Sequence, residues 1–400
     1  MKILKIIVVL FLLFQNVSFL SAQEITKNAE ISLITCSPGT EELYAHFGHS
    51  AFRVKDSTTN TDIIFNYGVF DFDTPNFYWK FIKGKLKYKL AVQPAYYFFQ
   101  MYAREGREVK EEKLILTEEE KSDVIEFLEW NYEPENRYYT YDFFYDNCSS
   151  KLWDVVKAQL KTEYVFDLGD YEEKTFRQML HEYLKNARWA GFGIDIALGL
   201  PADKTANFEE QMFLPDYLSD NMKNVQRGAK VSGGKSVLGP EKIIVKEKDN
   251  KKAISVVGQF FNNPVMIAWV FLGLMILLTI FFTHSSRRLF DLVFFSVTGL
   301  LGLFFLFLWT GTDHTAMNAN LDMLWASPLS AFYAFFLLKN RTTLLKIFTI
   351  MITVSVLILL LGWSALPQQF HLAVLPLALL VLVRMFDNLR SQFFIHQDME

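Results

Sequence analysis

The stretch YDFFYDNCSSK, residues 141–151, decides how the first half of this chain is interpreted. Aromatic residues alternate up to Tyr145 and predict a strand, and the apolar residues that follow recur at helical spacing. Asp146 and Asn147 are favourable N-caps, so we expect Cys148 in the first turn of that helix. The unpaired N–H groups and the helix dipole favour an anion there and lower the pKa of a thiol. Cys148 is therefore a candidate nucleophile.

A thiol nucleophile needs a base, and His49 in the segment HFGHSAFRV is the best candidate. The residues after His49 alternate in polarity, so His49 is predicted to begin a strand. His46 is a competing base, although it precedes the turn expected at Gly48. The simpler interpretation is that His49 is a strand histidine that bonds to a neighbour. The presence of Cys148 favours the interpretation that His49 is a catalytic base.

Composition divides the chain into two bodies. Of its 400 residues, 51% are hydrophobic and 16% aromatic, which is too apolar for an ordinary soluble protein. The formal net charge of −4 argues against a nucleic-acid partner. The His and Cys residues lack zinc-type spacing, and the chain has no G-x-S-x-G, Walker or dinucleotide glycine motif. We therefore expect neither a metal nor a cofactor.

The first 22 residues have the layout of a secretory signal peptide. Lys2 and Lys5 precede an apolar run over residues 6–14, and small residues follow up to Ala22, where cleavage is expected. The alternative is that residues 6–22 remain as a membrane anchor. Under either interpretation the following domain is exported.

Residues 23–258 are predicted to form an exported α+β domain. The strand from His49 and the returning segment IIFNYGVF flank the polar turn DSTTNTD, which predicts a hairpin. The segment KLKYKL, residues 85–90, alternates lysine with apolar residues and predicts a strand with one buried face. Thr117 and Glu120 form a capping box at the start of a helix.

Further elements follow from local pattern. We expect helices over 94–104 and 172–190, a loop over 193–203, a broken helix over 207–225 and a basic linker over 227–252.

Residues 259–400 are predicted to be a membrane domain with about five spans. The apolar segments are 264–282, 290–309, 324–338, 347–363 and 371–383. A span takes about 20 residues, so the third and fifth segments are short. Lys and Arg cluster in HSSRRL, in KNRTTLLK and in the tail after Arg384, whereas TGTDHTAMNANLD and SALPQQF carry none. The positive-inside rule therefore gives a cytoplasmic C-terminus and an exported N-terminal domain.

The loop over residues 310–322 is predicted to lie on the same side of the membrane as Cys148 and His49. It carries Asp313 and His314. The loop is either a solvated polar turn or a part that completes a site at the bilayer surface.

The two cysteines, Cys36 and Cys148, are the only possible disulfide pair in the chain. An exported compartment permits a disulfide, and such a bridge would remove the nucleophile. The alternative is that Cys36 is a lone core thiol.

The ordered set FGHSAFRV, IIFNYGVFDF, DNCSSKL, GIDIALGLPAD, QMFLPDYL and DHTAMNANLDMLWASPL resembles the Lnb-type membrane lipoprotein N-acyltransferases. The order of histidine and cysteine is also similar to circularly permuted NlpC/P60 domains. The resemblance implies an α+β papain-like exported domain followed by an all-α bundle of about five transmembrane helices, in a bacterial inner membrane. It also implies His49 as base and Cys148 as nucleophile, with a phospholipid as acyl donor and the α-amine of a lipoprotein as acceptor.

Papain-like sites add a polar residue that orients the histidine. Asn66, on the strand expected beside His49, is our candidate for this role, and Asn147 is a second residue that could support the site. Tyr67, Asp71 and Asp73 are rivals to Asn66.

Two other functions stay open at this stage. A membrane-anchored cysteine amidase or peptidase that acts on cell-wall peptides would use the same Cys148 and His49, with water as acyl acceptor. The third possibility is a non-catalytic envelope assembly or sensing protein. Five spans exceed what tethering requires, which favours a lipid substrate.

Overall fold

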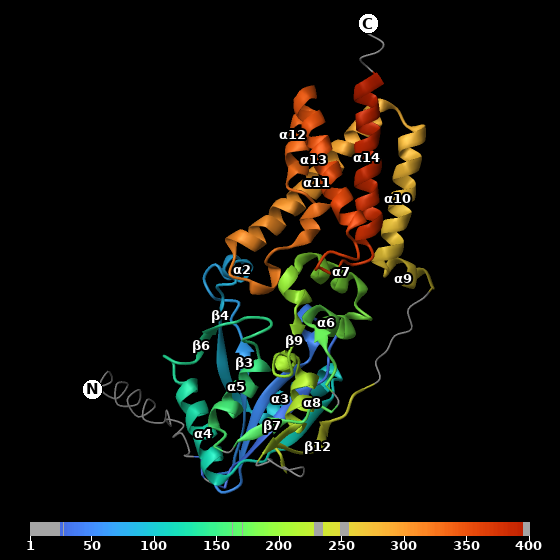
Figure 1. Ribbon diagram of the computed structural model, residues 1–400. Helices are drawn as coiled ribbons and strands as arrows, with labels where there is room; N and C mark the ends of the chain where they lie inside the picture. The colour runs from blue at the N-terminus through green and yellow to red at the C-terminus, as the bar shows by residue number, and fades with distance from the viewer. Residues whose placement is uncertain are drawn as a thin grey trace, which may run out of the picture.

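The computed structural model describes residues 25–26, 28–161, 163–169, 171–227, 235–248 and 256–394. The predicted signal peptide, residues 1–22, lies outside the described residues. An α+β domain and a helical bundle are stacked end to end, with α2 and α7 between them (Figure 1).

A seven-stranded antiparallel sheet forms the centre of the α+β domain, in the order β12-β5-β1-β2-β3-β4-β6. Its strands are β1 Glu30–Cys36, β2 His49–Asp56, β3 Thr61–Val69, β4 Lys87–Pro94, β5 Val109–Leu114, β6 Tyr138–Thr140 and β12 Leu238–Val245. The predicted hairpin is confirmed, because β2 pairs with β3 from Phe52–Phe65 to Asp56–Thr61. The predicted strand near residues 85–90 is also confirmed as the first half of β4.

Both faces of this sheet are covered by helices. Leu33 on β1 packs in the core that includes α4 (Glu118–Tyr132) and α5 (Ser150–Gln159). Its neighbour Ile34 belongs to the core of the opposite face, under α3 (Ala95–Glu105). Successive residues of a strand point to opposite faces, so apolar runs such as ISLITC can serve both layers. The predicted capping box at the start of α4 is present.

The segments predicted over 172–190 and 193–203 form different elements from those expected. The segment predicted as a loop over 193–203 forms the second half of α7 (Arg188–Ala197) and the 3-10 turn η2 (Leu200–Asp203). The helix predicted over 172–190 is instead α6 (Phe176–Leu184) followed by the start of α7. Gly191 does not end a helix, because it is buried inside α7 with its backbone close to Leu184.

The predicted linker over 227–252 contains the edge strand β12, and its remaining part lies partly outside the described residues. The pairing of β12 with β5 shifts register between Leu238 and Glu241, around Pro240. Proline cannot donate to a ladder and is tolerated on an edge strand at such an irregularity. Composition alone therefore did not reveal this strand.

The domain is completed by short elements that pack around the sheet. They are η1 Leu43–Phe47, α2 Phe77–Ile82, η3 Glu210–Phe213, α8 Pro215–Lys223, and the minor strands β7 Tyr164–Phe166, β8 Lys174–Thr175, β9 Thr205–Ala206, β10 Val225–Arg227 and β11 Lys235–Ser236. The broken helix expected over 207–225 is confirmed, because η3 and α8 meet at Leu214 before Pro215.

The helical bundle follows the predicted segments with different boundaries. It contains α9 Val256–Phe261, α10 Pro264–Phe281, α11 His284–Gly311, η4 Thr315–Met317, η5 Leu321–Leu324, α12 Leu329–Leu338, α13 Thr342–Leu361 and α14 Val374–Phe394. Within the described residues, α10, α11 and α13 are long and apolar enough to cross a membrane, and the segment with η4, η5 and α12 is a broken fourth candidate bent by 47°. The third predicted span is therefore helical only over α12.

The bundle is stabilised by a buried ion pair that hydropathy did not predict. Arg384 on α14 donates to both carboxylate oxygens of Asp291 on α11, at 2.6 and 2.9 Å, and both residues are inaccessible to solvent. A buried charge needs such a partner, since its desolvation is otherwise unopposed. The fifth predicted span ended at residue 383, whereas α14 continues through this pair to Phe394.

The two bodies share core residues across their junction. Ala316 of the bundle packs in the apolar cluster around α6, whereas Phe192 and Ile196 of α7 pack against the core of the bundle. Backbone bonds join the same surfaces, because Gly199 N donates to Ala316 O at 2.9 Å. The junction is therefore a packed interface in which each body buries side chains of the other.

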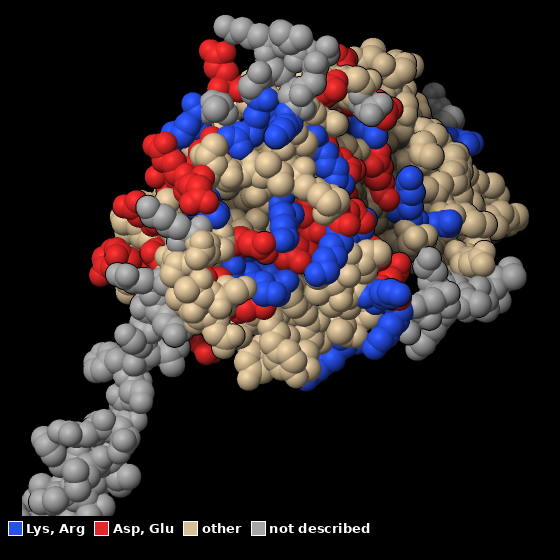
Figure 2. All heavy atoms as spheres, turned by 90° about the horizontal axis from the view of Figure 1, so that it is seen from below, with Lys and Arg blue, Asp and Glu red and all other residues tan. Residues whose placement is uncertain are grey.

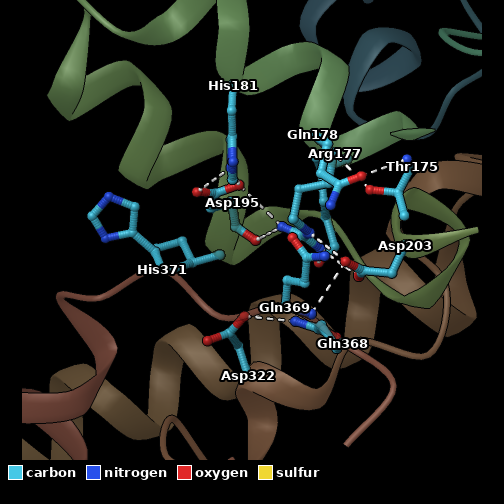
Figure 3. Close-up of polar contacts among 12 residues, drawn as sticks. Thr175, Arg177, Gln178, His181, Asp195, Asp203, Asp322, Gln368, Gln369 and His371 are labelled. Atoms are coloured by element: carbon cyan, nitrogen blue, oxygen red, sulfur yellow. Dashed lines mark hydrogen bonds and ion pairs between the residues drawn. The ribbon is translucent and has the colours of Figure 1, made fainter. Parts of the chain in front are cut away.

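Polar side chains reinforce this junction around Arg177, which lies between two carboxylates (Figure 3). Its guanidinium donates to Asp195 at 3.1 Å and to Asp203 at 3.0 Å, with all three side chains buried. The backbone N–H of Gln369, in the loop between α13 and α14, donates to Asp203 at 3.1 Å. This loop and the 310–322 loop, both predicted to face the exported side, thus contact the α+β domain.

The end of the molecule opposite to the bundle carries basic and acidic side chains interspersed over its surface (Figure 2). Interspersed charge is typical of a surface in contact with water. This end of the α+β domain is therefore hydrophilic.

Candidate active site

His49 is placed by a tight turn at the start of β2. Gly48 has a φ of 76°, and a Cβ at this position would lie 2.8 Å from the backbone oxygen of Cys36. Only glycine tolerates both the left-handed backbone and this close approach. Because Cys36 is the cross-strand partner of His49, the same turn sets the imidazole at the end of the sheet.

Cys148 lies in a turn just before α5, which begins at Ser150. The prediction of a strand up to Tyr145 was wrong. Asp142 and Asp146 instead form an isolated antiparallel bridge around a tight turn, with two backbone bonds of 3.1 and 3.0 Å. Cys148 was also predicted inside the first turn of the helix, but it lies two residues before the helix begins. The reason is that β6 ends at Thr140 and the chain reverses before the helix.

Asn147 has the capping role expected from the sequence. Its side-chain oxygen accepts the N–H groups of Ser149 and Ser150 at 2.7 and 3.0 Å. Its amide nitrogen donates to the backbone oxygens of Phe143 and Phe213, both at 2.8 Å. Since Asn147 is buried, these bonds fix the backbone on both sides of Cys148.

The Cys148 thiol and the His49 imidazole lie close together, and each shifts the pKa of the other. Burial opposes ionisation of the thiol, but His49 and the Ser50 N–H, which donates to the sulfur, lower the pKa of Cys148 below its ordinary value. Burial likewise disfavours the imidazolium, yet Cys148 and Asn66 raise the pKa of His49 above its ordinary value. Both shifts act in the direction of a thiolate–imidazolium pair.

Asn66 orients the imidazole as the sequence suggested. Its Oδ1 lies 2.6 Å from His49 Nε2, so that nitrogen donates to Asn66 and Nδ1 is the ring nitrogen left for the thiol. The rivals have other partners: Tyr67 donates to Asn131 at 2.6 Å, and Asp71 accepts the N–H of Asp73 in an exposed turn. The structure thus brings Cys148, His49 and Asn66 together.

The other histidine considered as a base does not take part in this arrangement. His46 lies in η1, on the far side of the Gly48 turn, whereas Cys148 lies close to His49.

Pattern reasoning missed residues whose contact with the thiol depends on tertiary packing. The Ser149 hydroxyl donates to the Ser50 hydroxyl at 3.1 Å, which joins the helix start to β2. Gly68, at a register shift in β3, packs against the Cys148 Cβ and the Tyr141 ring. Ser50 follows His49 and Ser149 follows Cys148 in the chain. This adjacency was the only signal in the sequence that pointed to the two serines.

Tyr139 is a further residue beside the thiol. Its phenol oxygen is buried, and it faces the Gly68 N–H. Among the residues that the structure describes, no acceptor for the phenol hydrogen lies in hydrogen-bonding geometry. Burial, together with the nearby Cys148, raises the pKa of Tyr139, so the phenol stays protonated and can donate.

Both cysteines are free thiols, so the disulfide between Cys36 and Cys148 is absent. Cys36 lies in the core under α3 and is inaccessible to solvent. Burial raises the pKa of Cys36 to about 12, which keeps it protonated and unreactive. Cys148, in contrast, is partly exposed.

Asp313 and His314 contact the end of α2 instead of the thiol. The Asp313 N–H donates to Lys83 O at 3.0 Å, and His314 Nε2 lies 3.0 Å from Phe81 O. The next residue, Thr315, donates to the Asp142 carboxylate at 2.6 Å. The 310–322 loop therefore holds the turn before Cys148 without supplying a group to the thiol in this structure.

A separate pocket of about 220 Å³ lies at the junction and includes His181, Asp195 and His371 among its lining residues. His181 Nε2 lies 2.7 Å from Asp195, as Figure 3 shows. Neither cysteine lines this pocket.

Within the described parts of the chain, no group of three or more His, Cys, Asp or Glu side chains is placed to hold a metal ion. Cys148 therefore remains the strongest candidate centre.

Comparison with known families matches two consecutive models. Residues 18–182 match the Lnb N-terminal periplasmic domain, and residues 257–393 match the Lnb transmembrane domain. His49, Asn66 and Cys148 all fall within the first match. Neither the curated proteins nor the solved structures give a match to the chain.

Proposed function

Because this chain belongs to the Lnb family, as a multi-pass membrane protein with an N-terminal periplasmic domain, we propose that it is a cysteine-dependent acyltransferase. It would move a fatty acyl chain from a phospholipid, through a thioester on Cys148, to the N-terminal α-amine of a lipoprotein. The papain-like character of its site rests on the Cys148, His49 and Asn66 arrangement.

The observation that carries this proposal is the grouping of thiol, imidazole and amide, next to an interface with the membrane domain. His49 interacts with Cys148, and Asn66 Oδ1 lies 2.6 Å from the opposite ring nitrogen. Each contact has a defined role in thiol catalysis, since the base must reach the nucleophile and must itself be oriented.

In the first half-reaction the Cys148 thiolate attacks the ester carbonyl of the phospholipid and forms a tetrahedral intermediate. The C–O bond to the glycerol then breaks, and the His49 imidazolium gives its proton to the departing alkoxide. The products are a thioester on Cys148 and a lysophospholipid. The lowered pKa of Cys148 favours this step, because it eases formation of the attacking thiolate.

In the second half-reaction the lipoprotein amine attacks the thioester carbonyl. The C–S bond breaks, neutral His49 accepts the amine proton, and the thiolate–imidazolium pair is restored. The sum of both steps converts an ester and an amine into an alcohol and an amide, with every proton accounted for.

The oxyanion of both intermediates requires donors close to the sulfur. The Ser149 N–H lies at the helix start, but it already donates to the Asn147 side chain at 2.7 Å. The phenol of Tyr139, buried beside Cys148 and without an acceptor among the described residues, is a better donor. We assign it to this role together with the Cys148 N–H.

The amidase and the non-catalytic alternatives receive less support. A tethered amidase gives no reason for the Thr315–Asp142 bond, by which the membrane domain holds the turn before the nucleophile. A sensing protein gives no reason for the combination of a lowered thiol pKa and an oriented base.

The test uses the full chain in vesicles that contain phosphatidylethanolamine with a radiolabelled acyl chain. We expect a hydroxylamine-sensitive label on the wild-type protein, which chases to a synthetic peptide with a diacylglyceryl cysteine at its N-terminus. Cys148→Ser and His49→Ala should abolish the label, whereas Cys36→Ser should retain it if the chain folds. Transfer that persists in Cys148→Ser would refute the proposal, and peptide cleavage without any lipid label would identify an amidase.

A further inference from the structure

Aromatic rings in contact with one another lead from the turn before the thiol to Phe77 on α2, the helix that lies against the membrane domain. Tyr141 stacks on Tyr88 with ring centroids 4.4 Å apart, and Tyr88 contacts Phe70 at 5.4 Å. Phe70 in turn lies 5.8 Å from Phe77 and 5.1 Å from Phe72. These contacts join β4, the turn before Cys148, the end of β3 and α2, which are distant in sequence.

One end of this series lies at the nucleophile. The Tyr141 ring and the Cys148 Cβ both pack against Gly68, within 3.6 and 3.5 Å of the position of a Cβ there. Burial and the adjacent Cys148 also raise the pKa of Tyr141. A group that lies over Tyr141 is therefore next to the sulfur.

The other end lies at the membrane boundary. Trp79 on α2 stacks on Phe307 of α11, with centroids 6.1 Å apart. Phe307 is one turn before the end of α11 at Gly311, and α2 lies against that end of the bundle (Figure 1). Trp and Tyr favour this depth, where the hydrocarbon meets the headgroups.

The α2 end of this path is exposed and apolar. Phe72 and Trp79 are 66% and 56% exposed and their neighbour Tyr78 is 74% exposed, whereas Phe77 is buried. Lys83 lies over the Trp79 ring at 4.9 Å, and Lys80 flanks it on the same helix. Exposed aromatic rings flanked by lysine suit a partner with an apolar chain and an anionic headgroup.

We propose that this aromatic track, defined as Trp79, Phe77, Phe72, Phe70, Tyr88 and Tyr141, carries a fatty acyl chain of a lipid from the outer leaflet to Cys148. The inference rests on the proposed function and names the route of its donor. The occupant is an acyl chain because one end of the track lies beside Cys148, and the other end lies on α2, whose Trp79 stacks on Phe307 of the membrane domain. The lysines of α2 hold the phosphate at the headgroup level.

The test uses the full-length Cys148→Ser protein in phosphatidylethanolamine and phosphatidylglycerol vesicles, with a diazirine at the end of one acyl chain. Irradiation followed by peptide mapping should label the segments that contain Phe70, Phe72, Tyr88 or Tyr141. Because Cys148→Ser forms no thioester, this readout is independent of catalysis. Labels confined to the helices of the bundle would overturn the track.

A second arm uses exposed positions whose substitution spares the core. Phe72→Ser with Trp79→Ser should reduce both crosslinking and acyl transfer from vesicles at least fivefold. The matched control is Tyr97→Ser on α3, which is 65% exposed and outside the track. Alkylation of Cys148 by iodoacetamide should be unchanged in all these variants. Equal crosslinking in the double variant and in the control would refute the track.

The two hypotheses fail in distinguishable ways. If the wild-type protein is labelled on the track but transfers no acyl chain, the track is supported and the proposed function is rejected. If acyl transfer requires Cys148 but the track is not labelled, the proposed function is supported and the track is rejected.

Discussion

Thr315 of the membrane domain donates a 2.6 Å hydrogen bond to the carboxylate of Asp142, in the turn that precedes Cys148. The other oxygen of the same carboxylate accepts the N–H groups of Phe144 and Tyr145 at 2.9 and 3.0 Å. One side chain therefore shapes the turn before the nucleophile and connects it to the bundle.

We expect Thr315→Val to reduce acyl transfer several-fold while the membrane domain remains folded. A hydrogen bond to a charged group contributes about 1.5–3 kcal/mol, and the lower end applies because Asp142 is partly exposed. The measurement is the initial rate in vesicles. Thr310→Val is the matched control, since that hydroxyl bonds within its own helix to Leu306 O. Equal rates in both variants would contradict a coupling role for Thr315.

Asn66→Ala should narrow the pH range over which Cys148 is reactive. Asn66 is one of the groups that raise the pKa of His49, so its removal lowers that pKa and the imidazolium is lost at a lower pH. The basic limb of the transfer rate against pH should therefore move to lower pH. Asn28→Ala, an exposed position bonded to Thr58, is the control. An unchanged basic limb would show that Asn66 does not act through His49.

Tyr139→Phe should separate oxyanion stabilisation from thiol activation. Loss of one oxyanion donor costs about a hundredfold in turnover, so kcat for acyl transfer should fall by about that factor. Alkylation of Cys148 by iodoacetamide forms no oxyanion and should proceed at the wild-type rate. A parallel fall in both reactions would indicate that Tyr139 only packs beside the thiol.

Gly48→Ala should displace His49 and weaken the fold. The substitution introduces a Cβ at 2.8 Å from Cys36 O in a left-handed backbone, which costs about 1–2 kcal/mol for the conformation alone. The thermal midpoint in detergent and the alkylation rate of Cys148 should both fall. Gly193→Ala is the control, because it lies within helix α7 and its Cβ would meet nothing within 4 Å. A variant at Gly48 that behaves like Gly193→Ala would refute the account of this turn.

Arg177→Met should destabilise the α+β domain where it meets the bundle. It leaves the buried Asp195 and Asp203 without their shared cation, and breaking a buried pair in this way costs about 3–5 kcal/mol. Chemical denaturation in detergent measures the free energy of unfolding. Lys157→Met breaks the exposed pair with Glu209, for which about 0–1 kcal/mol is expected. Similar losses in both variants would contradict the structural role of Arg177.

Local sequence pattern was sufficient to predict those elements whose signal lies within one segment of the chain. The hairpin from His49, the capping box at Thr117 and the membrane helices α10, α11 and α13 were predicted, because apolar periodicity and capping chemistry act over a few residues. The edge strand β12 and helix α7 were missed. Each is stabilised by a partner distant in sequence, β5 for the strand and the core of the bundle for Phe192 and Ile196.

The sequence by itself determined which groups could do chemistry, since Cys148, His49 and Asn66 are the thiol, imidazole and amide that it placed near strand and helix ends. Only the tertiary structure decided that they meet. The 2.6 Å contact of Asn66 with His49, the burial of Cys36, and the approach of Tyr139 to Cys148 depend on sheet register and long-range packing. Such contacts join residues far apart in the chain, so no local pattern encodes them.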